Sequence, residues 1–206
     1  MFFPIFTTIG LILAFFSVYM RRSRKGIDSE LKNFWDRELK ANSVRKQPLT
    51  DIIYIEPDFS ALPFDEAPSD DAVKDYQDRL LALKDKKIVN LSGVTNTDLK
   101  LKYGVANLDY LSSCDENYTE LVKNLYLWAN ALYSSGKKEE AVKVLEYGVF
   151  DIHTDVRSHY RLLADIYASD FDFEAIEKET LEAEKLTSQN RDAIVKMLKS
   201  EDYFHA

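Results

Sequence analysis

The chain contains a single cysteine, Cys114, among its 206 residues. One cysteine can form neither a disulfide within the chain nor a thiolate metal cage, and it fits a reducing compartment. The three histidines, His153, His159 and His205, form no short metal-binding motif. A free cysteine in a helical protein is usually a small buried hydrophobe rather than a nucleophile. We therefore expect no metal site, no cofactor and no catalytic thiol.

Glycine and proline are also scarce. The six glycines are scattered, so the chain has neither a Walker nor a Rossmann phosphate loop, and G-x-S-x-G and H-E-x-x-H do not occur. These absences predict no catalytic residues and a protein that is not an enzyme. Four of the five prolines fall between residues 42 and 69, and none follows Pro68, which favours an almost wholly helical body beyond that point.

Charge is missing from residues 2–20, which are rich in Phe, Ile, Leu and Val and can just span a hydrocarbon core as a helix. A cleaved signal peptide would have its basic residues before the apolar run, whereas here they follow it. A buried core helix is disfavoured because the run has no polar face. Residues 1–25 are thus predicted to be a single-pass anchor in the cell membrane. Its headgroup contacts would be Arg21, Arg22, Arg24 and Lys25.

The basic cluster and the remaining charge bear on topology and partners. By the positive-inside rule the cluster lies in the cytoplasm, which places the C-terminal domain there. The whole chain has a net charge of −8, and without that cluster 23 basic residues stand against 35 acidic ones, a net charge of −12. An acidic domain is repelled by nucleic acid and by an anionic leaflet, so we expect no nucleic-acid partner. The acidity could favour a basic partner segment, although it often serves solubility alone.

Residues 26–68 are predicted to connect the anchor to the helical domain. A short amphipathic helix begins near Asp28 and carries Leu31, Phe34, Trp35 and Leu39 on one face. This aromatic face suits either the membrane interface or a site on the domain. Beyond it, residues 52–55 and 59–64 are too apolar for a free tether, and we expect extended chain laid against the helices.

Residues 69–206 are predicted to form the helical domain. Helices are expected at about 70–86 and 97–113, with Gly104 punctuating the second of these, then in four blocks between 117 and 186, and finally at 191–200 as a covering helix. The blocks pair into two helical hairpins, because short connections join the first block to the second and the third to the fourth. Small residues recur at a spacing of 35, at Ala129 and Ala164 and again at Gly148 and Ala183.

This pattern resembles the tetratricopeptide repeat, whose period is roughly 34 residues. The first hairpin matches the family's large, small and glycine positions, whereas in the second Ile176 replaces a small residue and Phe171 replaces the glycine. The predicted fold class is therefore all-α, with antiparallel hairpins of a short α-solenoid preceded by one transmembrane helix. Residues 88–104 also resemble a block in uncharacterised bacterial membrane-anchored proteins. The positions that carry the family match in the first hairpin are Leu125, Trp128, Ala129, Leu132, Gly136, Ala141, Leu145 and Gly148.

In the tetratricopeptide family the first helix of each hairpin lines a concave groove that binds a peptide or helix. The resemblance implies a membrane-anchored adaptor that binds another protein there. The groove residues could instead be merely solvent-facing, or covered by residues 52–64 of the same chain. A non-catalytic subunit of a membrane assembly, associating through its transmembrane and juxtamembrane helices, is the alternative, and the layout is also similar to that of mitochondrial outer-membrane receptors. The matching groove positions are Lys123, Tyr126, Asn130, Tyr133, Ser158, Arg161 and Asp165.

Overall fold

The computed structural model describes residues 15–16, 19–20, 28–65, 68, 70–200 and 203. Within this part of the chain, the only pairing of extended backbone is an isolated bridge between Ile55 and Ile88, so the expected all-α class is confirmed there. One helix covers residues 28–43. The others are α2 (Asp71–Leu81), α3 (Asn96–Tyr103), α4 (Leu108–Ser134), α5 (Lys138–Glu146), α6 (Arg157–Ser169), α7 (Phe173–Glu184) and α8 (Arg191–Leu198), with 3-10 turns at Phe59–Ala61 and Val105–Asn107 and a π-helical turn at Tyr147–Asp151.

Packing divides the chain into two compact units. The first joins residues up to Pro48 to Thr95–Leu108, and the second joins Leu49–Val94 to Asp109–Ala206. Within the first unit, α3 packs on the helix over residues 28–43, where Glu38 accepts hydrogen bonds from Thr97 and Lys100. The boundary expected after residue 68 from composition stays a prediction.

Gly104 separates α3 from α4. Its φ of +82° is a conformation that L side chains rarely adopt, and the backbone carbonyl of Arg45 lies where a Cβ would stand. From Leu108 to Ser134 no further glycine or proline interrupts the chain, so α4 runs for 27 residues. The break expected at Gly104 is confirmed: α3 ends before it, and the residues that follow, up to 113, belong to a 3-10 turn and to α4.

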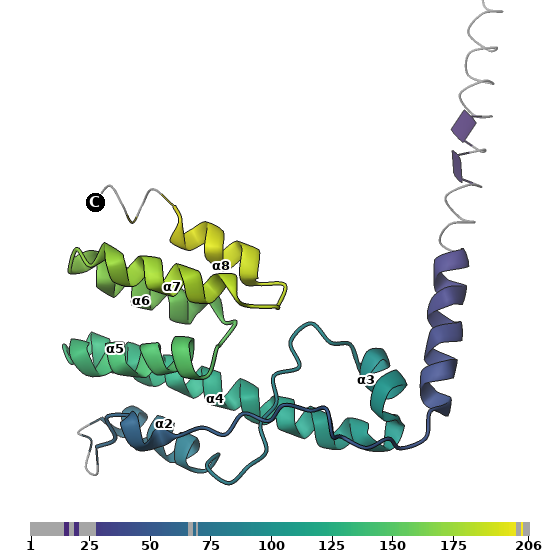
Figure 1. Ribbon diagram of the computed structural model, residues 1–206, viewed down its shortest axis with the longest axis horizontal. Helices are drawn as coiled ribbons and strands as arrows, with labels where there is room; N and C mark the ends of the chain where they lie inside the picture. The colour runs from purple at the N-terminus through teal and green to yellow at the C-terminus, as the bar shows by residue number, and fades with distance from the viewer. Residues whose placement is uncertain are drawn as a thin grey trace, which may run out of the picture. The chain divides into compact units, whose positions relative to one another are not determined.

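The second unit is a stack of helices built on α4. The two hairpins and α8 stack in chain order, with α6 in contact with α5, α7 and α8, and α2 lies on the side of α4 and α5 away from α6 (Figure 1). The apolar segment, residues 52–64, packs on the same hairpin: the ring of Phe64 lies 4.9 Å from that of Trp128, and the ring of Phe59 lies 6.4 Å from that of Tyr147. The core thus extends from this segment through both hairpins to Ile194 and Leu198 of α8.

The two hairpins have the same turn, displaced by 35 residues. After α4, the N–H of Lys137 donates to the carbonyl of Leu132 at 2.9 Å and the N–H of Gly136 donates to that of Tyr133 at 3.0 Å. After α6, the N–H of Asp172 donates to Tyr167 at 2.9 Å and the N–H of Phe171 to Ala168 at 3.0 Å. Both are Schellman motifs, which need a residue with positive φ. Gly136 has φ +81° and Phe171 has φ +58°.

A Phe171→Gly variant should be more stable than the natural chain by about 1 kcal/mol, because glycine adopts positive φ without the steric cost that a side chain incurs. Little packing is lost, since Phe171 is 70% exposed. Urea unfolding followed by circular dichroism measures the change. Gly136→Ala is the reciprocal control: no atom would lie within 4 Å of its new Cβ, so it should lose a similar amount through strain alone. Equal stability of Phe171→Gly and the natural chain would contradict the assignment of strain.

In the described part of the chain, no helix combines the length and the apolar character that crossing a bilayer requires. The anchor expected at residues 2–20 lies outside the described residues except for 15–16 and 19–20, which are helical. The basic residues Arg21, Arg22, Arg24 and Lys25 also lie outside them.

Candidate functional site

The four groove residues expected on α4 lie on the side of the helix opposite the buried ring of Trp128, as the 100° turn per residue requires. Lys123 is exposed and forms an ion pair with Glu120 at 3.3 Å. Asn130 and Tyr133 are exposed as well. This face of α4 is therefore open to solvent over most of its length.

Tyr126 differs from the other three because it is half-buried. Its ring centroid lies 5.7 Å from that of His159, at the start of α6. Burial lowers the pKa of His159 to about 4, so the imidazole that contacts Tyr126 is neutral near pH 7. Tyr126 helps to join the first hairpin to the second, and a substitution there would test packing as much as binding.

The apolar segment leaves the α4 groove face uncovered. Phe64 packs on Trp128 and Phe59 packs on Tyr147, which lie on the other side of the first hairpin from Lys123 and Asn130. Ile55 pairs with Ile88 rather than with α4 or α6. The contacts of this segment thus give no support to a groove filled by the chain itself.

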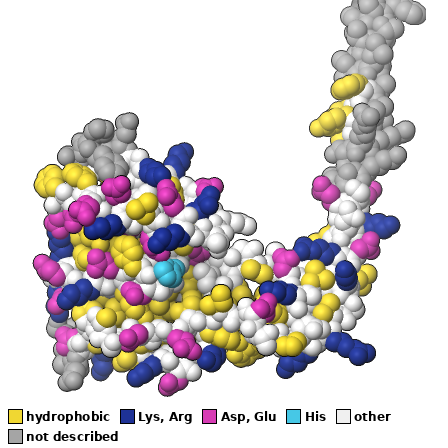
Figure 2. Space-filling model, viewed as in Figure 1, with side chains coloured by type: hydrophobic (Ala, Val, Ile, Leu, Met, Phe, Trp, Pro, Cys, Tyr) yellow, Lys and Arg dark blue, Asp and Glu magenta, His cyan; other side chains and the backbone are white. Residues whose placement is uncertain are grey.

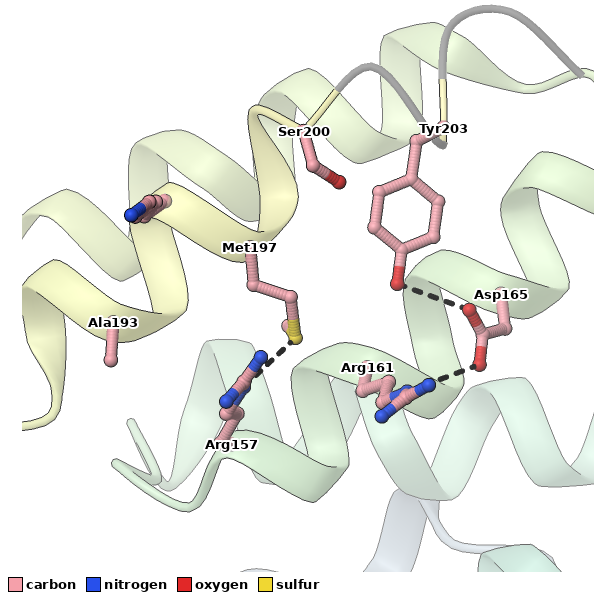
Figure 3. A pocket seen from close by; sticks show the side chains of 8 residues that line it. Arg157, Arg161, Asp165, Ala193, Met197, Ser200 and Tyr203 are labelled. Atoms are coloured by element: carbon pink, nitrogen blue, oxygen red, sulfur yellow. Dashed lines mark hydrogen bonds and ion pairs between the residues drawn. The ribbon is translucent and has the colours of Figure 1, made fainter.

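On α6, the expected residues Arg161 and Asp165 line a cavity of about 590 Å³ between α6 and α8, whereas Ser158 does not line it. Figure 3 shows Arg157, Arg161 and Asp165 on α6 facing Met197 on α8 and Ser200, which follows the end of α8. The remaining lining residues are Ala193, Lys196 and Tyr203. The cavity therefore unites two of the seven expected groove residues with six that sequence reasoning did not single out.

Hydrogen bonds fix one end of this cavity. The hydroxyl of Tyr203 donates to Oδ1 of Asp165 at 3.0 Å, and Nε of Arg161 lies 4.0 Å from Oδ2 of the same carboxylate (Figure 3). Burial, followed by the charge of Asp165, raises the pKa of Tyr203 to about 12. The phenol therefore stays protonated at neutral pH and continues to donate. Asp165, the single carboxylate among the described lining residues, is thus shared by Tyr203 and Arg161.

Positive charge is in excess at the other end. Nε of Arg157 donates to Sδ of Met197 at 3.2 Å, and a thioether is a weak acceptor. Among the described residues, neither Arg157 nor Lys196 has a carboxylate within ion-pair distance. The described lining residues include three cationic side chains and one anionic one. Elsewhere on the body, acidic and basic side chains are mixed over the face shown in Figure 2, with hydrophobic side chains between them.

Other chemistry has little structural basis in the described residues. They contain no group of three His, Cys, Asp or Glu side chains close enough to hold a metal ion. Cys114 is buried in α4, and burial raises the pKa of its thiol, so the thiolate that nucleophilic chemistry needs is disfavoured. The cavity between α6 and α8 is consequently the candidate site.

The spacing of Arg157, Arg161 and Asp165, four residues apart on α6, is a signal that the sequence contains. Lys196 and Tyr203 could not be found in the same way, because their place depends on how α8 packs.

No family model, no curated protein and no solved structure matches the chain.

Proposed function

We propose that the chain is a membrane-anchored, cytoplasm-facing adaptor of tetratricopeptide-like build that binds a peptide or helix of another protein. The observation that carries the proposal is the repeated interhelical turn, in which Gly136 and Phe171 occupy equivalent places 35 residues apart. Phe171 stands where the family carries glycine, and its φ is nevertheless positive. This conservation of backbone conformation supports a structural repeat.

The small residues of the repeat support the same proposal. Ala129, Ala164, Gly148 and Ala183 are all buried, where neighbouring helices approach closely. At Gly148 a Cβ would lie 2.9 Å from Cδ2 of His159, so a larger residue would push the hairpins apart. Stacking of this kind leaves the first helix of each hairpin free to line a shared groove.

The groove would use α4, α6 and α8 as its wall. Lys123, Asn130 and Tyr133 offer polar and aromatic contacts along α4, and the cavity beside α6 offers charge. Residues 1–25 would hold this groove at the inner surface of the cell membrane, where partners of the same membrane are locally concentrated.

A second candidate function rests on a separate observation. The helix over residues 28–43 exposes Leu31, Phe34, Trp35 and Leu39, each more than half accessible to solvent. These side chains share one face of the helix. A structural subunit of a membrane assembly would associate through this face and the anchor rather than through the groove.

Site-specific photocrosslinking in native membranes separates the two candidates. A benzophenone amino acid at Asn130 should yield one predominant protein adduct, several-fold more abundant than the adducts formed from Lys143, an exposed control position on α5. The adduct should disappear when the neighbouring Tyr133 is changed to Glu. Adducts formed at Trp35 and not at Asn130 would favour the structural subunit. Equal yields at Asn130 and Lys143 would contradict a groove site.

A further inference from the structure

The cavity between α6 and α8 has the size and the polarity of a ligand site. Its volume of about 590 Å³ lies within the range of pockets that hold small ligands or a few side chains. The walls supply guanidinium, ammonium and hydroxyl groups from two helices and from Tyr203 (Figure 3). These donors, set against one carboxylate among the described lining residues, are suited to an anion.

From these features we infer that the cavity binds an acidic segment of a partner protein, in extended conformation, through Arg157, Arg161 and Lys196. The inference rests on the proposed function and names the class of ligand that its groove would take. Guanidinium groups bind carboxylates through two parallel hydrogen bonds, which are short and strong. Arg157 is available for this because its described partner is only a thioether.

Spacing favours carboxylates on alternate residues of an extended chain. Arg157 and Arg161 are four residues apart on α6, which corresponds to a rise of about 6 Å along the helix. In an extended segment, side chains two residues apart lie on one face at a distance of about 6.7 Å. A segment with the pattern acidic-x-acidic, running along α6, would therefore meet both guanidinium groups at once.

The hydroxyl groups argue for an extended segment rather than a helix. Ser200 lies on the lining beside Met197, and its hydroxyl can donate or accept. Only an extended peptide presents free backbone N–H and C=O groups to such a partner, because a helix bonds its own. An extended ligand can thus form hydrogen bonds with the Ser200 hydroxyl through its backbone, which a docked helix cannot do.

The charge of the whole protein makes this site selective. The chain carries a net charge of −8, so an acidic segment is repelled by most of the surface and attracted to the cavity. The same excess of acid opposes contact of the body with an anionic leaflet. This favours a protein segment over lipid headgroups as the source of the bound acidic group.

Fluorescence anisotropy with the full chain in nanodiscs of neutral phosphatidylcholine tests the inference. The probe is a labelled peptide of alternating Glu and Ser, and its matched control replaces each Glu by Gln. The Glu peptide should bind, and Arg157→Glu, Arg161→Glu or Lys196→Glu should weaken it about tenfold or more. Arg191→Glu makes the same charge change on α8, where Arg191 already pairs with Asp192 outside the lining, and should change binding less than about twofold.

A second readout uses the unaltered protein. Carbodiimide joins a bound carboxylate to a nearby amine, so the Glu peptide should form an amide with Lys196 and not with Lys143. Equal binding of the Glu and Gln peptides, or equal weakening by Arg191→Glu, would overturn the inference. So would competition by inorganic phosphate or by phosphatidylglycerol vesicles at matched anion concentration, since the site would then accept any anion. If these tests fail while Asn130 still crosslinks to a partner, the adaptor remains and only its ligand class is wrong.

Discussion

Replacing Glu179 by glutamine is expected to raise the free energy of unfolding by about 3 kcal/mol at pH 7. Glu179 is fully buried on α7, and in the described structure neither carboxylate oxygen has a hydrogen-bond partner. Burial, with a smaller contribution from the charge of Asp165, raises its pKa from 4.5 to about 9. The folded protein therefore keeps a proton there that the unfolded chain releases at neutral pH.

The direction of the stability change follows from the pKa of Glu179 in the folded and unfolded states. Below pH 4.5 both states hold the proton, and no stability is lost. Between pH 4.5 and 9 only the unfolded chain releases it, so the natural protein loses about 1.4 kcal/mol for each pH unit. Glutamine carries no such proton, and the advantage of the variant should grow steadily from pH 4.5 to pH 9.

Urea unfolding at several pH values measures this difference. Glu177→Gln is the matched control, because Glu177 lies on the same helix and is exposed, and it should change stability by no more than about 0.5 kcal/mol. A gain for Glu179→Gln that did not vary with pH would contradict a proton held by the folded state. No gain at pH 8 would contradict the burial of an unpaired carboxyl group.

Trp128→Ala is expected to destabilise the second unit by about 3–5 kcal/mol. The side chain is fully buried between the helices of the first hairpin, and Phe64 of the apolar segment packs on it at 4.9 Å between ring centroids. Its loss opens a cavity and also removes the surface on which the segment rests. The indole Nε1 has no acceptor in the described structure, so Trp128→Phe should cost much less than Trp128→Ala.

Trp35, the other tryptophan of the chain, is the control position for this prediction. Trp35 is 55% exposed on the helix over residues 28–43, so Trp35→Ala should change stability by no more than about 0.5 kcal/mol. Urea unfolding of both variants gives the comparison. Similar losses for Trp35→Ala and Trp128→Ala would contradict the central position of Trp128.

The helical hairpins could be predicted because their signal is local. Apolar residues at steps of three and four located the helices of both hairpins, and the spacing of Ala129 and Ala164 is the basis on which a repeat is proposed. The departure at Phe171 was visible in the sequence, but its positive φ was not, because only the turn hydrogen bonds impose it. The break at Gly104 was expected from the sequence and is confirmed as the end of α3, whereas the 27-residue length of α4, which begins at Leu108, was not expected.

The candidate site was harder to predict because it depends on packing between elements. Arg161 and Asp165 were expected to line the groove, whereas Arg157, Lys196 and Tyr203 join them only when α8 folds onto α6. Glu179 stands at helical spacing from Ile176 and Ala183 on the buried stripe of α7, yet a charged residue on such a stripe is not expected from its type. Sequence periodicity identifies a face, but tertiary contacts decide what that face encloses.

The coverings of the helical stack limit its growth. Hairpin arrays are one-dimensional, and a bare terminal face could add another copy end to end, as in an open filament. Here α2 and the apolar segment occupy one end of the stack, and α8 occupies the other (Figure 1). In the described part of the chain, the two ends of the stack are therefore α2 with the apolar segment and α8, rather than bare hairpin faces that could pair with another copy.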